Sequence, residues 1–231
     1  FVQSELSYAN NSHTLTLNST GTFTVEPINN YFYNDGASGT PASVTLSGTT
    51  SSGNLTGSGS LSGLVINSIA NLGGLTIGKS SSSTNSTLNV SSAITINGAI
   101  TFYGSNITFG SGANLNSNAN TGNGNISLVA STAINLIGTI TLTTGSGNLT
   151  LTTPRINGTN LYRNDATSAY QYGKFSITST GVFTIEPYST TFDGNFMGSL
   201  ATPGGQFDLI GSVASNTFTG TNETEWLIVN N

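Results

Sequence analysis

Short triplets of alternating apolar and polar residues between Leu75 and Thr153 constrain the fold of this chain more than any other feature. Each triplet has the period of two that is typical of a half-buried strand, with its outer residues facing inward. Gly, Asn and Ser clusters separate the triplets and supply turns. Most triplets start roughly six to thirteen residues apart, which is too short for a crossover helix. The triplets are residues 75–77, 88–90, 94–96, 100–102, 107–109, 126–128, 134–136, 140–142 and 149–151.

This pattern predicts an all-β fold, specifically a right-handed parallel β-helix (β-solenoid) with about three short strands in each rung. Each inward Ile, Leu, Val or Phe would then stack on its counterpart in the next rung, about 4.8 Å away. Burial of one such side chain contributes roughly 1.5–3 kcal/mol. A single rung cannot cover its own apolar side chains, so the prediction favours long arrays.

A long internal repeat indicates how the chain is organised. Residues 14–27 return without a gap as residues 174–187, and the offset from Phe23 to Phe183 is 183 − 23 = 160 residues. Residues 64–67 also return, as residues 227–230. We therefore predict a first module at residues 1–160, most regular at 64–153, and the start of a second module at 161–231 that continues the same solenoid.

Two Gly/Ser-rich stretches interrupt the triplet pattern. Residues 36–63 are predicted to be a less regular part of the coil or an ordered loop, and residues 111–124 to bulge from the coil. The chain begins at Phe1 without an initiator Met or the apolar segment of a signal peptide, so we expect it to be a piece of a longer protein.

The composition argues against several classes of partner. Charged residues make up 6% of the chain, and its four cationic side chains are scattered, so we predict no binding of nucleic acid or of anionic lipid. No run approaches the length of a membrane span, so we predict no membrane insertion. The absence of Cys excludes disulfides and thiolate sites. The composition, rich in Thr, Asn and Gly, is typical of extracellular surface proteins, which is the location we predict.

The distribution of acidic residues argues against an enzyme. Residues 36–164 contain no Asp or Glu, whereas an enzyme built on a β-helix needs carboxylates for acid–base chemistry or for holding a cation. We therefore predict no catalytic residues, no cofactor and no metal site, and we rank a degraded polysaccharide-cleaving enzyme below the binding and structural hypotheses.

Glu26 and Glu186 occupy the same position in the two copies of the repeated segment. A carboxylate in this position could bind a ligand or a cation. It could equally be a turn residue that accepts hydrogen bonds beside the proline that follows it. Because copying a module reproduces its scaffold as well as its sites, the second interpretation is favoured.

Aromatic residues cluster after each copy of the repeated segment. Tyr31, Tyr33 and Tyr188 are the candidate ligand-contact residues, because exposed rings can stack on sugars. Packing at the junction between modules is the alternative, and it is favoured because buried aromatics are the commoner case.

The central residues of many triplets are threonines, and these would face outward. Arrays of threonine on solenoids are used by some ice-binding proteins, so ice binding is one hypothesis. The alternative is that Thr simply suits an exposed strand position. Asn89, Ser127 and Asn135 interrupt the series, and the triplets are expected on different faces, so the alternative is favoured. The threonines are Thr76, Thr95, Thr101, Thr108, Thr141 and Thr150.

Residues 73–79, 93–104 and 124–128 resemble the tandem repeats of giant cell-surface adhesins of Bacteroidota, including the gliding-motility adhesins of flavobacteria. They are similar, more loosely, to β-helices of the filamentous-haemagglutinin type. The resemblance covers residues 14–230. It implies export to the cell surface and a role as a structural repeat in the stalk or filament of an adhesin that attaches cells to surfaces or to other cells.

The expected partners follow from that role. They are neighbouring repeats of the same chain, a polysaccharide or an abiotic surface, and other copies through lateral self-association. A module that itself binds polysaccharide is the alternative function.

Overall fold

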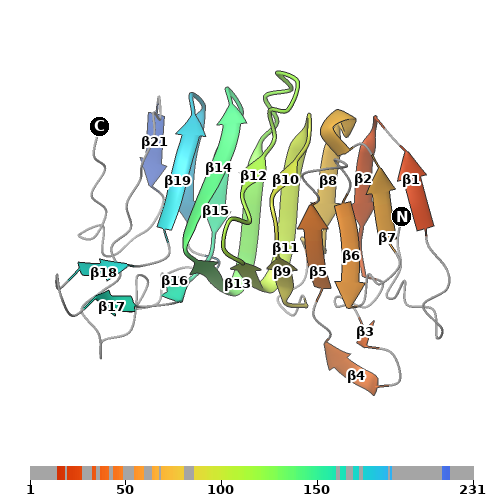
Figure 1. Ribbon diagram of the computed structural model, residues 1–231, viewed down its shortest axis with the longest axis horizontal. Coiled ribbons are helices and arrows are strands. Elements are labelled where there is room, and N and C mark those ends of the chain that lie inside the picture. The colour runs from red at the N-terminus through yellow and green to blue at the C-terminus, as the bar shows by residue number, and fades with distance from the viewer. Residues whose placement is uncertain are drawn as a thin grey trace.

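The computed structural model describes residues 15–18, 20–27, 33–34, 37–41, 44–48, 55–59, 64–67, 69–80, 86–159, 162–164, 169–171, 174–186, 188 and 215–218. These residues form strands and one short 3₁₀ helix, η1 (Ile69–Asn71), so the predicted all-β class is confirmed. Most strand pairs are parallel, and the strands lie side by side along the longest axis of the molecule (Figure 1). No helix in the described ranges is long and apolar enough to cross a membrane.

The parallel strands form three ladders, which we call A, B and C. Ladder A and ladder B belong to one 13-stranded sheet, and ladder C is a separate 4-stranded sheet. Ladder A contains β2 (Thr22–Val25), β8 (Gly74–Ile77), the first half of β11 (Ala99–Phe109), the first half of β13 (Ile126–Ile137), β15 (Leu149–Thr152), β20 (Val182–Glu186) and β21 (Ser215–Phe218), paired in that order.

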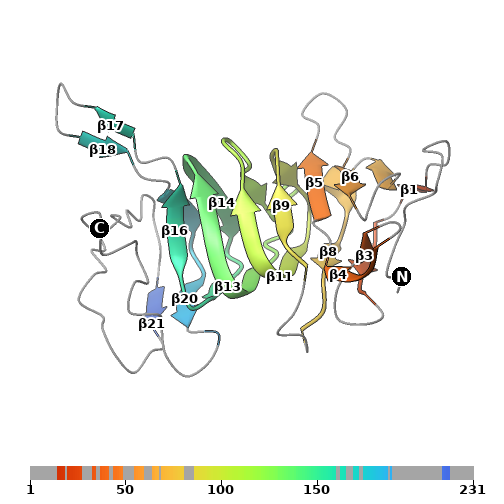
Figure 2. The same ribbon diagram turned by 90° about the horizontal axis from the view of Figure 1, so that it is seen from below.

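Ladder B uses the second halves of the two long strands. It contains β5 (Val44–Gly48), β9 (Leu88–Val90), residues 106–109 of β11, residues 133–137 of β13 and β16 (Ile156–Thr159). The register between β11 and β13 shifts at Gly104 and Asn106, where ladder A gives way to ladder B. Figure 2 shows β5, β9, β11, β13 and β16 side by side.

Ladder C contains β10 (Ile94–Thr95), β12 (Leu115–Asn116), β14 (Thr139–Gly145) and β19 (Lys174–Ser179), all parallel. From β8 onward the chain visits ladders A, B and C in that order, and it does so four times before β20 returns it to ladder A. One such visit to the three ladders is called a pass.

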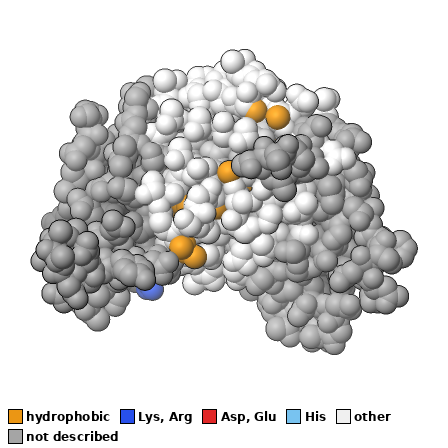
Figure 3. All heavy atoms as spheres, in the orientation of Figure 1, with side chains coloured by type: hydrophobic (Ala, Val, Ile, Leu, Met, Phe, Trp, Pro, Cys, Tyr) orange, Lys and Arg blue, Asp and Glu red, His pale blue; other side chains and the backbone are white. Residues whose placement is uncertain are grey.

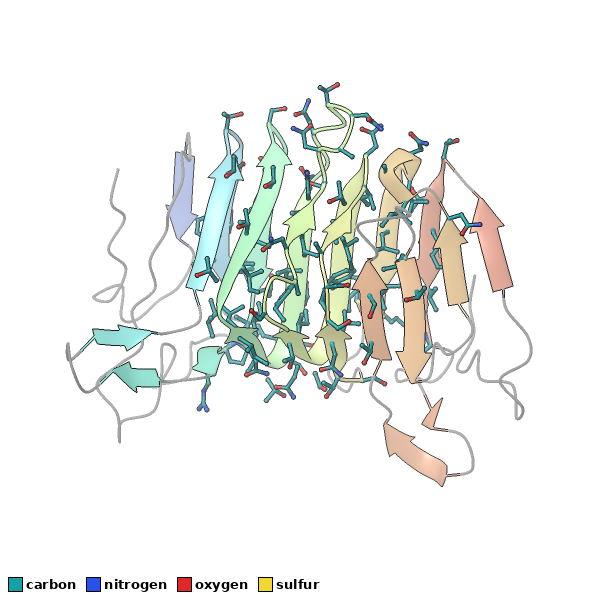
Figure 4. All side chains as sticks on the ribbon, in the orientation of Figure 1. Atoms are coloured by element: carbon teal, nitrogen blue, oxygen red, sulfur yellow. The ribbon has the colours of Figure 1, made fainter. Side chains whose placement is uncertain are left out.

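The apolar triplets predicted from the sequence are the inward-facing parts of these ladders. In every one of them the two outer residues are buried and the central residue is partly exposed. The buried residues are in register from pass to pass: Leu75, Ile100, Ile126, Leu149 and Phe183 follow one another in ladder A. They form one apolar core, and their side chains fill the space between the sheets (Figure 4).

Antiparallel pairing appears outside the triplet region. The stretch 36–63, predicted to be less regular or a loop, contains β5 and β6 (Leu55–Gly59), which pair with each other antiparallel. β6 also pairs antiparallel with β7 (Leu64–Asn67), which in turn pairs in parallel with β1 (Leu15–Asn18). β3 (Tyr33–Asn34) with β4 (Ala37–Pro41), and β17 (Tyr162–Asn164) with β18 (Ala169–Gln171), are separate antiparallel pairs.

The two copies of the repeated segment are placed partly alike. β2 in the first copy and β20 in the second both belong to ladder A. The strand that precedes each differs, because β1 pairs with β7 in the large sheet whereas β19 pairs with β14 in ladder C. The predicted module boundaries at residues 160 and 161 remain a prediction.

Candidate functional site

A single outward column of hydroxyl side chains runs along ladder A. Its members are the central residues of successive strands, each directly in register with the next, and all are partly exposed where their side chains are described. We call this column the threonine ladder; it consists of Thr24, Thr76, Thr101, Ser127, Thr150, Thr184 and Thr217. Because neighbouring strands are about 4.8 Å apart, its hydroxyl groups repeat at that interval.

The hydroxyl groups of Thr76, Thr101, Ser127 and Thr150 have no hydrogen-bond partner among the described residues. A hydroxyl can donate one hydrogen bond and accept two. β8, β11, β13 and β15 also contain no Asp, Glu, Lys or Arg. The threonine ladder therefore presents neutral hydroxyl and methyl groups to the solvent between its two ends.

The expectation that the outward threonines are spread over different faces is confirmed for half of them. Thr95 and Thr141 belong to strands of ladder C, and Thr108 belongs to ladder B. The other three, Thr76, Thr101 and Thr150, share the threonine ladder. Ser127 is a member of that column and retains its hydroxyl, while Asn89 and Asn135 stand on ladder B and interrupt nothing in ladder A.

The equivalent outward column of ladder B has a different chemistry. Thr45, Asn89, Thr108, Asn135 and Asn157 follow one another there in register. The Asn135 amide donates a hydrogen bond to the Thr108 hydroxyl, with 3.3 Å between Nδ2 and Oγ1. Two side chains of this column thus bond to each other, unlike those of Thr76, Thr101, Ser127 and Thr150 in the threonine ladder.

A stack of glycines lies where the chain enters ladder A, and we call it the glycine corner. A Cβ atom added to Gly98 would lie 1.8 Å from the carbonyl oxygen of Gly73, and one added to Gly124 would lie 2.2 Å from the carbonyl carbon of Gly98. Successive passes therefore approach backbone to backbone, and only glycine fits. The corner consists of Gly73, Gly98, Gly124, Gly147 and Gly181.

Buried hydroxyl groups satisfy the backbone at the glycine corner. Ser117 donates to the carbonyl oxygen of Gly124. Thr144 Oγ1 lies 2.7 Å from the carbonyl oxygen of Gly147 and 2.6 Å from Ser179 Oγ. All three hydroxyl-bearing residues are buried. Because an unpaired buried carbonyl is costly, these hydroxyls are part of the scaffold and are not open to a ligand.

Asparagine side chains join neighbouring passes beside the glycines. Asn125 Oδ1 accepts a hydrogen bond of 2.8 Å from the backbone amide of Asn148, and Asn148 Oδ1 accepts one of 3.0 Å from the amide of Val182. Both asparagines are exposed. Their carbonyl groups are engaged within the protein, so they are poor acceptors for an external ligand.

The two glutamates of the repeated segment have different surroundings. The Thr152 hydroxyl donates a 2.8 Å hydrogen bond to Glu186 Oε1, and the two residues are opposite each other in β15 and β20. Glu26 follows β2, so its neighbour in ladder A is Gly78, which offers no such side chain. The hydrogen-bonding interpretation therefore fits Glu186, and the described residues contain no group of three metal-ligating side chains.

The described residues do not test whether the candidate tyrosines form a site. Tyr31 lies outside the described residues. Tyr33 begins β3, and its side chain also lies outside what the structure describes. Tyr188 is partly buried just after β20. Their role as ligand contacts therefore remains a prediction.

The sequence analysis missed the glycine corner, although the sequence contains a signal for it. Every triplet that enters ladder A is preceded by the same arrangement: a Gly, any residue, then apolar, Ser or Thr, apolar. The triplets of ladder B lack that glycine, whereas in ladder C it precedes two of the four strands, as Gly138 before Ile140 and Gly173 before Phe175. The glycine thus separates ladder A from ladder B in the sequence, but it does not by itself separate ladder A from ladder C.

Comparisons with known proteins give no relative for this chain. No family model, no curated protein and no solved structure matches it.

Proposed function

We propose that the chain is a right-handed parallel β-helix and serves as a structural repeat in the stalk or filament of a long extracellular adhesin, which attaches cells to surfaces or to other cells. The observation that carries the proposal is the constant order in which the chain visits ladders A, B and C. Parallel strands joined by short turns around one apolar core are typical of β-solenoids.

The handedness in this proposal follows from a general rule. Connections between parallel strands of one sheet are right-handed in nearly all proteins, because strand twist favours that hand. Each connection from one strand of ladder A to the next, for example from β13 to β15, is such a crossover.

The proposed role is to provide length. Five strand pairings separate β2 from β20 along ladder A: β2–β8, β8–β11, β11–β13, β13–β15 and β15–β20. The same interval corresponds to the 160-residue offset between Phe23 and Phe183. With about 4.8 Å for each pairing, one copy would lengthen the molecule by about 24 Å.

The surface is consistent with a spacer exposed to solvent. In the described part of the face shown in Figure 3, most atoms are neutral polar groups or backbone, with scattered hydrophobic side chains and one small basic spot at the lower left edge. A solenoid needs neighbouring units at its ends to cover its core and its strand edges, so we propose that adjacent repeats of the same chain are its main partners.

The length proposal is tested with chains that contain one, two and three copies of the 160-residue unit. We expect the maximum dimension in small-angle X-ray scattering to grow by about 24 Å per copy while the cross-section stays constant. Growth in the cross-section, or beads of separate globules in electron micrographs, would contradict the proposal.

Attachment is tested separately by displaying three copies on a cell that does not adhere, with and without the rest of the parent protein. We expect firm attachment only when the parent's other regions are present, since the repeats supply reach. Retention of a single copy on agarose or cellulose would instead favour the alternative function of a polysaccharide-binding module.

A further inference from the structure

We propose that the threonine ladder binds ice, that is, the ordered water at the surface of an ice crystal. This inference rests on the register of the strands in ladder A, so it can fail or hold independently of the adhesin proposal. The ligand is defined by its chemistry: a neutral, rigid and periodic array of water molecules.

The first argument is periodicity. The column presents one hydroxyl and one methyl group on nearly every strand, in register from Thr24 to Thr184 with Ser127 as the only member without the methyl. Threonine is stiff at χ1, so neighbouring strands display the same groups in similar orientations. A rigid array loses little conformational entropy when it binds a rigid ligand.

The second argument is that the hydroxyl groups are available. Those of Thr76, Thr101, Ser127 and Thr150 have no hydrogen-bond partner among the described residues. Each can both donate to water and accept from it. A row of such groups at about 4.8 Å intervals can therefore hold a row of waters in fixed positions, while the methyl groups restrict the alternatives.

The third argument separates ice from a sugar polymer. Binding of sugars relies on amides, carboxylates and exposed rings. The amide carbonyls of Asn125 and Asn148, which flank the column, are occupied by backbone amides of the next pass. The described strands of ladder A between β2 and β20 contain one aromatic ring outside the core, that of Tyr103, and no charged side chain. The groups of ladder A that remain available to a ligand are therefore mainly the neutral hydroxyl groups of the threonine ladder.

Ladder B provides an internal contrast. Its outward column mixes Thr with Asn, and the Asn135 amide donates a hydrogen bond to the Thr108 hydroxyl. Two of its polar groups are thus engaged with each other and its amides interrupt the hydroxyl groups, so ladder B is not expected to bind ice. The repeat extends the contrast, because Thr24 and Thr184 are equivalent residues in the two copies and tandem copies would continue the threonine ladder.

The test compares the unaltered chain with two variants of equal bulk. Thr101→Tyr places a large ring in the middle of the threonine ladder, and Thr141→Tyr places the same ring at an outward position of ladder C. Ice recrystallisation in a frozen sucrose solution is followed by microscopy, and thermal unfolding by circular dichroism shows that both variants are folded. We expect inhibition by the unaltered chain, loss of inhibition in Thr101→Tyr and full inhibition in Thr141→Tyr.

Two outcomes would overturn the proposal. One is that the unaltered, folded chain does not inhibit recrystallisation, and the other is that both tyrosine variants inhibit it equally well. Binding to insoluble cellulose that Thr101→Tyr abolishes, without any effect on ice, would assign the column to a polysaccharide instead. Should Thr101→Tyr fail to fold, Thr101→Val serves in its place, because it removes the hydroxyl and keeps the shape. If the length increment of the multi-copy chains holds while ice binding fails, only this inference is wrong.

Discussion

Two corners of each pass are built in opposite ways. The first leads from ladder C into ladder A, and the second leads from ladder B into ladder C. The first repeats one arrangement, with a glycine two residues before the first inward residue in every pass, as in Gly98 before Ile100. The second varies in length: residues 91–93 connect β9 to β10, residues 110–114 connect β11 to β12, and Gly138 alone connects β13 to β14.

The difference shows which corner fixes the register of the passes. At the glycine corner successive backbones are too close for a Cβ atom, so any slip or insertion would force them apart. At the second corner the contacts between passes are ordinary from β9 onward: a Cβ atom added to Gly110 would lie 3.4 Å from its nearest neighbours, the carbonyl oxygens of Ser91 and Val90. The tight contact at this corner lies earlier, where a Cβ atom added to Gly48 at the end of β5 would lie 1.6 Å from the carbonyl oxygen of Ala93. The register of the threonine ladder is therefore set at the glycine corner.

The largest effect is expected from replacing a glycine at the glycine corner. In Gly98→Ala the new methyl group would lie 1.8 Å from the carbonyl oxygen of Gly73, so β8 and β11 must separate. We expect the free energy of unfolding to fall by about 3 kcal/mol, the upper end of the usual cost of overpacking. Urea denaturation followed by circular dichroism measures it.

Gly110→Ala is the matched control for this prediction. Its Cβ atom fits, and replacing glycine reduces the freedom of the unfolded chain, so we expect stability to be unchanged or to rise by about 0.4–1 kcal/mol. Equal losses in the two variants would show that the two corners do not differ in the way the glycine stack indicates.

The contrast between the two corners also explains how much of this fold could be predicted from the sequence. The triplets predicted strands and their buried residues correctly, because the alternation of Ile100, Thr101 and Phe102 already states which side chains face inward. Parallel pairing was predicted from the short segments between the triplets, which leave no room for crossover helices. The sequence analysis did not separate the three ladders, because a ladder B triplet such as 107–109 resembles 100–102 when the preceding glycine is ignored, and the ladder C triplet 140–142 carries the same glycine.

Other features were beyond the reach of the local pattern. The antiparallel pairing of β5 with β6 depends on contacts between Gly/Ser-rich strands that carry little hydrophobic signal. The single column of hydroxyl groups in ladder A depends on the register between strands about 25 residues apart, for example Thr76 with Thr101, which no short window of sequence contains.

An intermediate effect is expected from the buried hydroxyl of Thr144 at the glycine corner. Thr144→Val keeps the shape of the side chain but removes the hydroxyl that lies 2.7 Å from the carbonyl oxygen of Gly147. The Ser179 hydroxyl can still donate to that carbonyl, at 3.1 Å, so the buried group keeps one partner. We therefore expect a loss of about 1–2 kcal/mol, within the range for an incompletely satisfied buried group.

The control for this prediction is Thr139→Val, an exposed position in the same strand, β14. A surface substitution of this kind changes stability by less than about 0.5 kcal/mol. Thermal and urea unfolding of the two variants give the comparison. If Thr144→Val were as stable as Thr139→Val, the buried hydroxyl would have no part in holding the glycine corner.

The smallest effect is expected from the asparagines that join successive passes beside the glycines. Asn148→Ala removes the acceptor for the backbone amide of Val182. Because Asn148 is exposed, water can replace the lost bond, and we expect stability to fall by about 0.5–1 kcal/mol, the lower part of the range for one hydrogen bond. Amide hydrogen exchange at Val182 should quicken more than exchange at Ile126, whose amide donates to a backbone carbonyl, that of Asn148.

Asn148→Asp tests whether loss of the hydrogen-bond acceptor is what speeds amide exchange at Val182 in Asn148→Ala. It retains an oxygen in place of Oδ1, and a carboxylate accepts the bond from Val182 at least as well as an amide does. Amide exchange at Val182 should therefore stay slow in Asn148→Asp and become faster in Asn148→Ala. If Asp and Ala behaved alike, the asparagine would contribute by turn propensity alone, and the glycines and buried hydroxyls would be left as the groups that hold one pass to the next at this corner.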